Sequence, residues 1–462
     1  MRLLDSSTQP ANGAEDYDRN SNNDDAAFHP KSAWAMVAIL AMMLLMSFID
    51  RFSLSVLVGP IKHDLQLSDT QIGLLLGTAF GVFYSTAGLP SGYLIDRYNR
   101  RNLLVAGVVV WSLMTVISGF SQNVTTLFIG RMGVGLGEAV LTPAAYSLIK
   151  DAFPERLRGR AYGFYLFGSS VGAGAAFVVA GYLERVFTGV NVGFIPFVTH
   201  LSPWQYVLIV IGAAGIPLAA LGLAIREPAR NRLETLETAR LSAVLNHVDE
   251  NRRIYWPLLL LCAVWGICIF SYGAWVPTAL GRAWNFPATV TGSKYGFITM
   301  CLAPLAAILF SGQFDRLARS NRSHAIPLYA GVACILVAIP TAVGPLAFNP
   351  ALTWICLGIN IFSAMGVQLS LTLVLAHVTP GRMIGKMSAC CFLCMNLVGL
   401  GFGPMLIAVV AEKLGSRPES IGHALSLVVC TGWLMVGALF LTIWRAIRAQ
   451  TNSKVGQQVP AT

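Results

Sequence analysis

The chain alternates long apolar runs with short polar breaks between residues 33 and 445. Most runs hold about 20 residues, the length that an α-helix needs to cross the hydrocarbon core of a bilayer. The run at 160–184 is rich in glycine and alanine, and the run at 293–313 is short. The pattern predicts an all-α membrane protein with twelve transmembrane helices at 33–58, 71–94, 103–121, 125–148, 160–184, 204–225, 254–280, 293–313, 324–345, 351–376, 387–411 and 423–445.

A charged break at 226–253 divides the apolar runs into two sets of six. The middle of this break favours helix by composition, so we expect a cytosolic linker between two six-helix bundles. The first 31 residues hold six acidic and three basic residues and lack the apolar centre of a signal peptide. The predicted parts are a disordered cytosolic tail (1–31), the first bundle (32–225), the linker (226–253), the second bundle (254–445) and a cytosolic tail (446–462).

The two halves carry matching motifs. PERLRGR at 154–160 aligns with PGRMIGK at 380–386, and GYLIDR at 92–97 aligns with SGQFDR at 311–316. Each pair occupies equivalent breaks in its own half, after the second and the fourth apolar run. Parallel repeats of this kind are a transporter architecture, with the substrate site at the repeat interface near the midplane of the bilayer.

The composition is 55% hydrophobic and only 12% charged, whereas a soluble domain carries roughly a quarter charged residues. The net charge of +10 is unevenly placed, because the breaks on one side hold 24 Lys and Arg and those on the other side hold six. Basic residues gather on the cytoplasmic side of membrane proteins. We therefore expect both termini in the cytosol, in the cytoplasmic membrane, and no nucleic-acid partner.

No residue pattern points to an enzyme, a cofactor or a metal. All nine cysteines fall in predicted helices of the second half, where Cys390, Cys391 and Cys394 form a CCxxC cluster. A redox or metal site would want exposed, paired thiolates, so packing of small apolar side chains is the simpler interpretation. We also find no nucleophile–base pair, and the sequence predicts no enzyme, cofactor or bound metal.

Four charged residues lie within predicted helices, where each costs about 2.5–3.5 kcal/mol on insertion scales. They are Asp50 and Arg51 on the first helix and Arg131 and Glu138 on the fourth. Neighbours on a helix point about 100° apart, so Asp50 and Arg51 cannot face each other well, whereas Arg131 and Glu138 share one face. Counting from the outer helix ends puts Asp50 about 12 Å deep, Arg131 about 9 Å and Glu138 about 20 Å. We expect Asp50 to lie level with Arg131.

Two interpretations of these charges remain open. A buried ion-pair network could simply fix helix packing, although such networks are weak sources of net stability. Alternatively, the charges form a proton and headgroup site. Desolvation raises the pKa of a carboxyl group and a nearby arginine lowers it, so a cavity that opens to alternate sides would load and release a proton. Glu138 is the deeper acid, and Pro143 frees the carbonyl of Ala139 beside it.

Three stretches resemble a known family. GYLIDRYNRR at 92–101 resembles the loop signature G-x-L-x-D-R-x-x-R-R of the major facilitator superfamily, with Asn99 where glycine is usual. Asparagine tolerates the left-handed backbone better than most residues, so we expect the turn to survive. RMGVGLGEA at 131–139 resembles the fourth-helix signature. IDRFS, DRYNR and GEA, followed by Pro143, are similar to the Spinster family of lysolipid and sphingolipid-phosphate transporters.

The resemblance implies a role for each motif residue. Asp50 and Glu138 would be the proton-coupling acids, and Arg51 and Arg131 would be their partners or the ligands of a substrate headgroup, because a guanidinium carries forked donors. Asp96 would cap the start of the eleventh helix near Gly385 and hold the inner gate shut, since an anion is stabilised at a helix N-terminus. The implied gating set is Asp96, Arg97, Arg101, Asp315 and Arg316.

Polar residues are few in the second half, so a charged first bundle would face a mostly apolar second bundle, which suits an amphipathic substrate. We therefore predict a monomeric, proton-coupled secondary transporter that moves a lysophospholipid-like or sphingoid-like molecule among membrane lipids by alternating access. A proton symporter for sugar acids or aromatic acids is one alternative, with more polar groups expected in the second bundle. A non-transporting lipid sensor is the other, although a sensor has little need for matched gate motifs.

Overall fold

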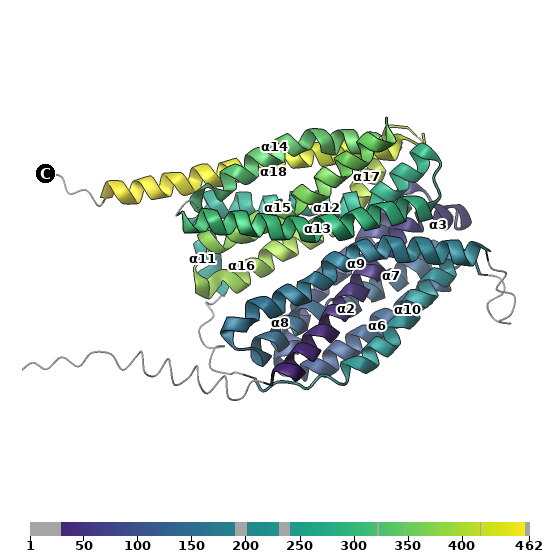
Figure 1. Ribbon diagram of the computed structural model, residues 1–462, viewed down its shortest axis with the longest axis horizontal. Coiled ribbons are helices and arrows are strands. Elements are labelled where there is room, and N and C mark those ends of the chain that lie inside the picture. The colour runs from purple at the N-terminus through teal and green to yellow at the C-terminus, as the bar shows by residue number, and fades with distance from the viewer. Residues whose placement is uncertain are drawn as a thin grey trace, which may run out of the picture.

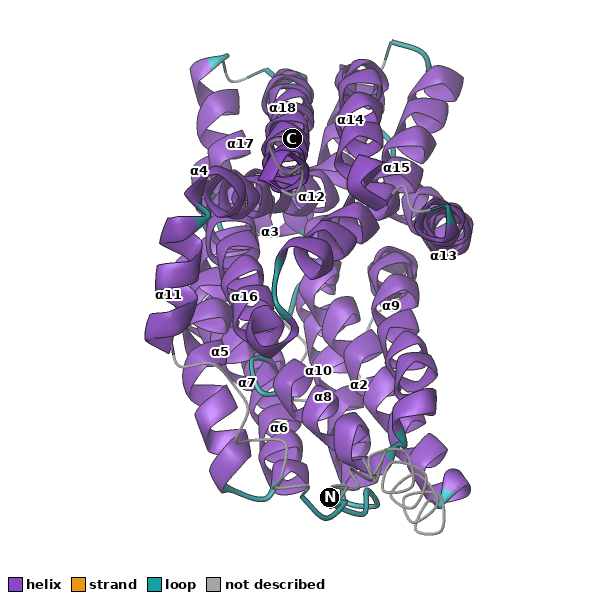
Figure 2. Ribbon diagram, turned by 90° about the vertical axis from the view of Figure 1, so that its left-hand side faces the viewer, coloured by secondary structure: helices purple, strands orange, loops and turns teal. Residues whose placement is uncertain are grey.

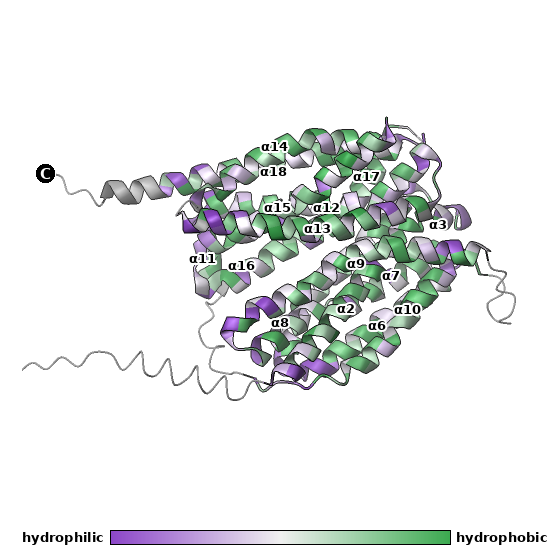
Figure 3. Cartoon of the chain, in the orientation of Figure 1, coloured by the Kyte–Doolittle hydropathy of each residue, from purple (hydrophilic) through white to green (hydrophobic). Residues whose placement is uncertain are grey.

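The computed structural model describes residues 29–189, 201–230, 241–320, 323–346, 348–415 and 417–457. Regular structure in these residues is entirely helical, and twelve helical segments are long and apolar enough to cross a membrane (Figure 2). The two segments with the weakest apolar signals in the sequence are among them, as Glu155–Gly189 and Val290–Leu317. Apolar residues cover the middle of the helices and polar residues collect at their two ends (Figure 3).

The predicted tails are only partly described. Residues 1–28 lie outside the described residues, and the first helix begins at Pro30. At the other terminus the last helix continues to Gln457, into the stretch 446–462 that we expected to be a tail. Of the predicted linker, residues 226–230 and 241–253 are described, and the second stretch holds the helix Leu241–Glu250.

The first bundle holds six membrane-spanning segments, two of which are interrupted. Its helices are α2 (Pro30–Val56), α3 (Val58–Asp64), α4 (Asp69–Gly73), the π-helical turn η1 (Leu74–Thr78), α5 (Ala79–Arg97), α6 (Arg100–Gly119), α7 (Val124–Glu138), α8 (Leu141–Ala152), α9 (Glu155–Gly189) and α10 (Pro203–Gly222). Helix α2 packs along α9, and α6 packs against α7 and α10. Helices α2, α6, α7, α8, α9 and α10 form the lower half of Figure 1.

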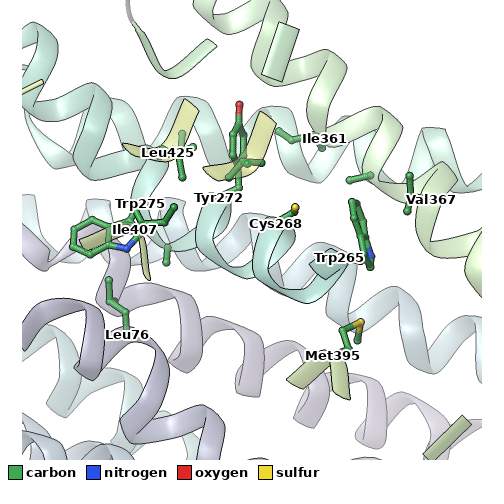
Figure 4. Packing of buried hydrophobic residues seen from close by; sticks show 14 of the residues in the cluster. Leu76, Trp265, Cys268, Tyr272, Trp275, Ile361, Val367, Met395, Ile407 and Leu425 are labelled. Carbon is green, nitrogen blue, oxygen red and sulfur yellow. The ribbon is translucent and has the colours of Figure 1, made fainter. Parts of the chain in front are cut away.

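The second bundle forms the upper half of Figure 1. Its helices are α11 (Leu241–Glu250), α12 (Arg252–Trp284), α13 (Ala288–Arg319), η3 (Ser323–Ala325), α14 (Ile326–Val343), η4 (Gly344–Leu346), α15 (Pro350–Val378), α16 (Gly381–Cys394), the π-helical turn η5 (Met395–Leu400), α17 (Gly401–Lys413) and α18 (Ser420–Gln457). Helix α18 packs against α12 and α14. Buried side chains of α12, including Trp265, Tyr272 and Trp275, occupy the centre of this bundle (Figure 4).

Asparagines begin several helices by capping their first backbone N–H groups. Asn99 accepts a hydrogen bond from the backbone N–H of Asn102 at the start of α6, with a backbone φ of −65°. The expectation that Asn99 replaces glycine through a left-handed conformation was therefore wrong. Its side chain is instead an N-cap, a position that asparagine favours. Asn123 caps α7 and Asn349 caps α15 in the same way.

The interruption of the fourth segment lies at Glu138. Helix α7 ends at Glu138 and α8 begins at Leu141, two residues before Pro143. Proline has no backbone N–H to bond the carbonyl four residues earlier, which is the local reason for the break. The sequence predicted that Pro143 frees the carbonyl of Ala139, and here α7 and α8 are two short helices that meet beside Glu138.

The two bundles make tight contact at the end of the molecule that carries α3. We call it the opposite end, because it lies opposite the end that carries the linker helix α11. Here η1 and α4 pack on α17, and α9 packs on α13. A Cβ atom added at Gly81 would lie 2.6 Å from the backbone nitrogen of Gly401. One added at Gly174 would lie 2.6 Å from the carbonyl oxygen of Gly296. Only glycine allows the backbones to approach so closely.

Ion pairs and hydrogen bonds also join the bundles at the opposite end. Arg282 of α12 donates to both oxygens of Asp69, at 2.9 and 2.7 Å, and Lys62 donates to Asp69 at 2.6 Å. The backbone N–H and hydroxyl of Thr70 donate to Glu412 of α17, at 3.0 and 2.8 Å. Forked contacts of this kind fix orientation better than single ones. We call these residues, Lys62, Asp69, Thr70, Arg282 and Glu412, the end latch.

A further acid at the opposite end is held ionised. Trp204 at the start of α10 donates its indole N–H to Asp64 at 2.8 Å. Burial acts to raise the pKa of Asp64, but hydrogen bonds from Ser202 and Trp204 outweigh burial and hold the pKa below its usual range. The resulting stability is present above the unfolded pKa of about 3.9 and is lost only as the pH falls through the lower folded value. Asp64 therefore does not titrate near neutral pH.

At the other end, where α8, α11 and the start of α16 lie and which we call the linker end, the described glycines of α5 and α16 make no close contact with the facing bundle. A Cβ atom added at Gly88 or Gly92 of α5, or at Gly385 of α16, would meet no atom within 4 Å. Leu89 and Tyr93 of α5 are 64% and 62% exposed. In Figure 1 the helices of the two bundles separate towards this end. The described chain is closed at the opposite end and open at the linker end.

Candidate functional site

The four intramembrane charges form two ion pairs between α2 and α7. Arg131 donates from Nη1 to Asp50 Oδ1 at 2.9 Å, and Arg51 donates from Nη2 to Glu138 Oε2 at 2.7 Å. All four residues are buried, with exposed fractions of 9% or less. The structure thus brings together the four residues that the sequence singled out, and it places Asp50 beside Arg131 as expected.

Helix geometry explains the crossed pairing. Asp50 and Arg51 are neighbours on α2 and point about 100° apart, so each needs a partner on another helix. Arg131 and Glu138 are two turns apart on α7 and therefore share one face. This face of α7 presents one cation and one anion to α2, so Arg131 pairs with Asp50 and Glu138 pairs with Arg51. Each charge thereby gains the counter-ion that a buried charge requires.

Two hydroxyl groups complete the site, and sequence reasoning missed both. Ser47 donates from Oγ to Glu138 Oε2 at 2.7 Å, and Thr115 of α6 donates from Oγ1 to Asp50 Oδ2. Ser47 lies one helical turn before Arg51, so its position was a usable signal. Thr115 carries no such signal, because its contact depends on how α6 is rotated against α2.

Aromatic rings surround the guanidinium of Arg51. Its Cζ atom lies 4.5 Å from the ring centre of Phe80, 4.9 Å from that of Tyr84 and 5.1 Å from that of Phe48. A cation over an aromatic face is attracted to it, by about 2 kcal/mol or more when water is excluded. The rings exclude water from the pair and hold the arginine in place on the side of α5.

Some polar atoms of the site have no hydrogen-bond partner among the described residues. They are Nε of Arg51, Nε of Arg131 and Oε1 of Glu138. Buried polar atoms are normally bonded, and a charged carboxylate oxygen is costly to leave without a donor. The arrangement can therefore take up a proton or bind a molecule that offers a donor and an acceptor.

The predicted gating residues lie at the linker end and are not joined across the bundles. Asp96 is exposed, its backbone carbonyl accepts a hydrogen bond from Arg230, and within the described ranges its carboxylate has no ion pair. Arg97 donates to Tyr93 at 2.8 Å and Arg101 to Asn102 at 3.1 Å. Asp315 and Arg316 are exposed on α13. The expected contact of Asp96 with the start of α16 is absent from the described residues in this conformation.

A neighbouring arginine of the same motif is the buried one. Arg100 is 1% exposed and pairs with Asp151 at the end of α8 and with Glu227 after α10. Arg100 was not among the predicted gating residues. Its contacts join the start of α6 to the end of α8 and to the first residues of the linker, Glu227 and Pro228.

Three polar side chains of the second bundle form hydrogen bonds within that bundle. Asn360 donates to Thr341 at 2.9 Å, and Gln368 accepts from Trp265 at 3.0 Å. Asn396 donates to the backbone carbonyl of Phe392. The second bundle contributes Leu400 and Phe270 to the apolar cluster around Phe80. These two side chains are apolar and lie in the same cluster as Phe48, Phe80 and Tyr84, the rings around Arg51.

Comparisons with known proteins agree with this architecture. The family model described as Major Facilitator Superfamily matches residues 40–404. An MFS-type efflux pump of Mycolicibacterium smegmatis is 27% identical over 425 residues, which cover 89% of this chain and 92% of that protein. Protein spinster homolog 1 of Xenopus tropicalis is 25% identical over 445 residues, covering 88% and 80% of the two chains.

A probable L-galactonate transporter of Escherichia coli is 31% identical over 273 residues, covering 54% of this chain and 56% of that protein. Among solved structures, a bacterial homolog of the human lysosomal transporter Spinster, in an inward-facing and unoccupied conformation, superposes with a TM-score of 0.73 at 22% identity. That match covers 92% of this chain and 98% of the other. The family model spans most of the two bundles described above, and the chain therefore belongs to the Major Facilitator Superfamily.

Proposed function

We propose that this transporter moves an amphipathic, lipid-like substrate of the lysophospholipid or sphingoid type and couples that movement to protons. The observation that carries the proposal is the pairing of two buried carboxylates with two buried arginines in the first bundle, opposite an apolar second bundle. The charged side suits a headgroup and the apolar side suits a hydrocarbon chain. The similarity to Spinster proteins supports the same substrate class.

The proton enters through the acidic residues Asp50 and Glu138. Protonation of either acid removes one partner of a buried ion pair and so weakens the contact between α2 and α7. The arginine of that pair, Arg51 or Arg131, then has no counter-charge and can bind the phosphate or carboxylate of a headgroup. Proton uptake and substrate binding are thereby linked at one site near the middle of the membrane.

The described conformation corresponds to one state of an alternating-access cycle. The excess of basic residues at the linker end supports a cytosolic position of that end and of both termini, in the cytoplasmic membrane. The open linker end then makes this conformation inward-facing, the state named for the similar Spinster homolog structure. In the opposite state Asp96 would meet the start of α16 and the end latch would separate. The chain works as a monomer in this cycle.

A sugar-acid symporter is the second candidate, favoured by the similarity to a probable L-galactonate transporter. A sugar acid carries hydroxyl groups along its whole length and needs hydrogen-bond partners from both bundles. The second bundle uses the side chains of Asn360 and Gln368 within itself, which speaks for a substrate with an apolar part.

Ligand-dependent thermal stability of the purified protein separates the two candidates. A ligand that binds only the folded state raises the unfolding temperature as its concentration exceeds the dissociation constant. We expect a lysophospholipid or sphingosine to raise the unfolding temperature, by different amounts at pH 6 and pH 8. We expect L-galactonate to leave it unchanged. Stabilisation by L-galactonate alone would replace the lipid proposal by the sugar-acid one.

The close glycine contacts predict how the cycle can be blocked. In Gly81→Val the added atoms would collide with the backbone of Gly401 and Leu400, which cannot move aside as a flexible side chain can. We expect the opposite end to be held open, with longer distances between spin labels on α4 and α17 and with transport lost. Gly88→Val on the same helix is the control, because no atom lies within 4 Å of its Cβ position. Equal label distances in the two variants would contradict the closed opposite end.

A further inference from the structure

The two buried carboxylates differ in how their oxygens are bonded. Asp50 accepts one hydrogen bond on each oxygen, on Oδ1 from Arg131 and on Oδ2 from Thr115. Glu138 accepts both of its hydrogen bonds on Oε2, from Arg51 and from Ser47, each at 2.7 Å. Its other oxygen, Oε1, is buried without a partner among the residues that the structure describes.

This difference decides which acid takes up a proton first. A proton on Oε1 of Glu138 removes an unbonded charged oxygen and displaces neither donor from Oε2. A proton on Oδ1 of Asp50 would displace Arg131. A proton on Oδ2 would require the hydroxyl of Thr115 to turn towards the backbone carbonyl of Trp111, 3.0 Å away. Protonation of Glu138 therefore disturbs the fewest contacts.

The charged and titratable neighbours of Glu138 come from several helices. Asp50 and Arg51 lie on α2, and Arg131 lies on α7 with Glu138 itself. Tyr84 of α5 faces Arg51, and Tyr165 of α9 lies near Tyr84 and Arg51. Asp50 is the one carboxyl group among these neighbours. The hydrogen bonds to its two oxygens stabilise its ionised form. The negative charge of Asp50 repels the charge on Glu138 and so favours proton uptake there.

We propose that Glu138 receives the coupled proton on Oε1 while Asp50 remains ionised, and that Ser47 is the positioning residue that sets the pH of this step. The proposal rests on the proton coupling proposed above. Ser47 and Arg51 lie one turn apart on α2 and so share a face, which lets both donate to the same oxygen. The hydroxyl of Ser47 stabilises the ionised form of Glu138 and holds back proton uptake until the pH falls.

Substitution of Ser47 tests the role of its hydroxyl. Ser47→Ala removes one hydrogen bond to a charged group, so we expect the pH midpoint of the conformational change to move upward by about one unit. Ser47→Thr keeps the hydroxyl and should restore the midpoint. Thr115→Val should move the midpoint less, because Asp50 keeps Arg131. A Ser47→Ala midpoint equal to that of the unchanged protein would overturn the assignment of Ser47.

Infrared difference spectra between high and low pH identify the protonated acid with Ser47 intact. We expect the carboxylic acid C=O band to vanish in Glu138→Gln and to remain in Asp50→Asn. The reverse result would overturn the order of protonation and leave proton coupling standing. If the band belongs to Glu138 but transport ignores the proton gradient, the proposed function fails while the protonation site stands.

Discussion

Glu138→Gln is expected to abolish the pH-driven conformational change and proton-driven transport while leaving the helices folded. The amide keeps the shape of the side chain and can still accept from Ser47 and Arg51, but it cannot take up a proton. Distances between spin labels at the linker end, measured across a pH titration, should therefore stop changing.

Two variants control this result. Glu419→Gln alters an exposed acid in the loop before α18 and should behave as the unchanged protein. Asp50→Asn leaves Arg131 without its counter-ion near Glu138, and a freed positive charge opposes protonation. We expect its pH response to persist with the midpoint moved downward. An unchanged pH response in Glu138→Gln would refute the proton role of this residue.

Arg51→Ala is expected to move both the pH midpoint and the substrate affinity. It leaves the carboxylate of Glu138 buried without its cation, a change that typically costs about 3–5 kcal/mol. Glu138 should then be protonated at much higher pH, with the midpoint raised by about two units or more. Affinity for an anionic or zwitterionic lipid should fall, because the forked donor for its headgroup is gone.

Arg51→Lys separates the two effects. The lysine keeps the charge beside Glu138, so the midpoint should stay close to its original value. The ammonium lacks the fork of the guanidinium, so lipid affinity should still fall. Arg131→Ala is the matched variant on the other pair, and it should raise the midpoint by freeing Asp50. If Arg51→Ala changed neither the pH midpoint nor the lipid affinity, the ion pair of Arg51 and Glu138 would serve helix packing alone.

The fold followed from the sequence because the apolar runs have the length of a bilayer and each must become a helix. The break beside Glu138 was also predictable, since Pro143 acts on the backbone of its own helix. The conformation of the transporter could not be predicted from the sequence. Asp96 was expected to close the linker end, but a sequence cannot say which of two states of a transporter is populated, and both use the same residues.

The candidate site was predictable in its charges and not in its supporting contacts. Asp50, Arg51, Arg131 and Glu138 stood out because charge in a membrane helix is expensive. The pairing of Asp50 with Arg131 followed from their similar depth. The donors Ser47 and Thr115 depend on the rotation of α2 and α6 about their own axes. The pair of Asp69 and Arg282 in the end latch was missed, because the two residues are far apart in the sequence and no motif links them.

Uptake by the purified protein in sealed liposomes, driven by a pH difference, tests the central claim most directly. A labelled lysophospholipid and labelled L-galactonate would be offered in parallel, with Glu138→Gln liposomes as the control. We predict that the lysophospholipid crosses faster when a proton gradient is imposed, that the gradient collapses as it crosses, and that Glu138→Gln abolishes both effects. Lysophospholipid movement at the same rate with and without the gradient, or gradient-driven uptake of L-galactonate alone, would contradict the account.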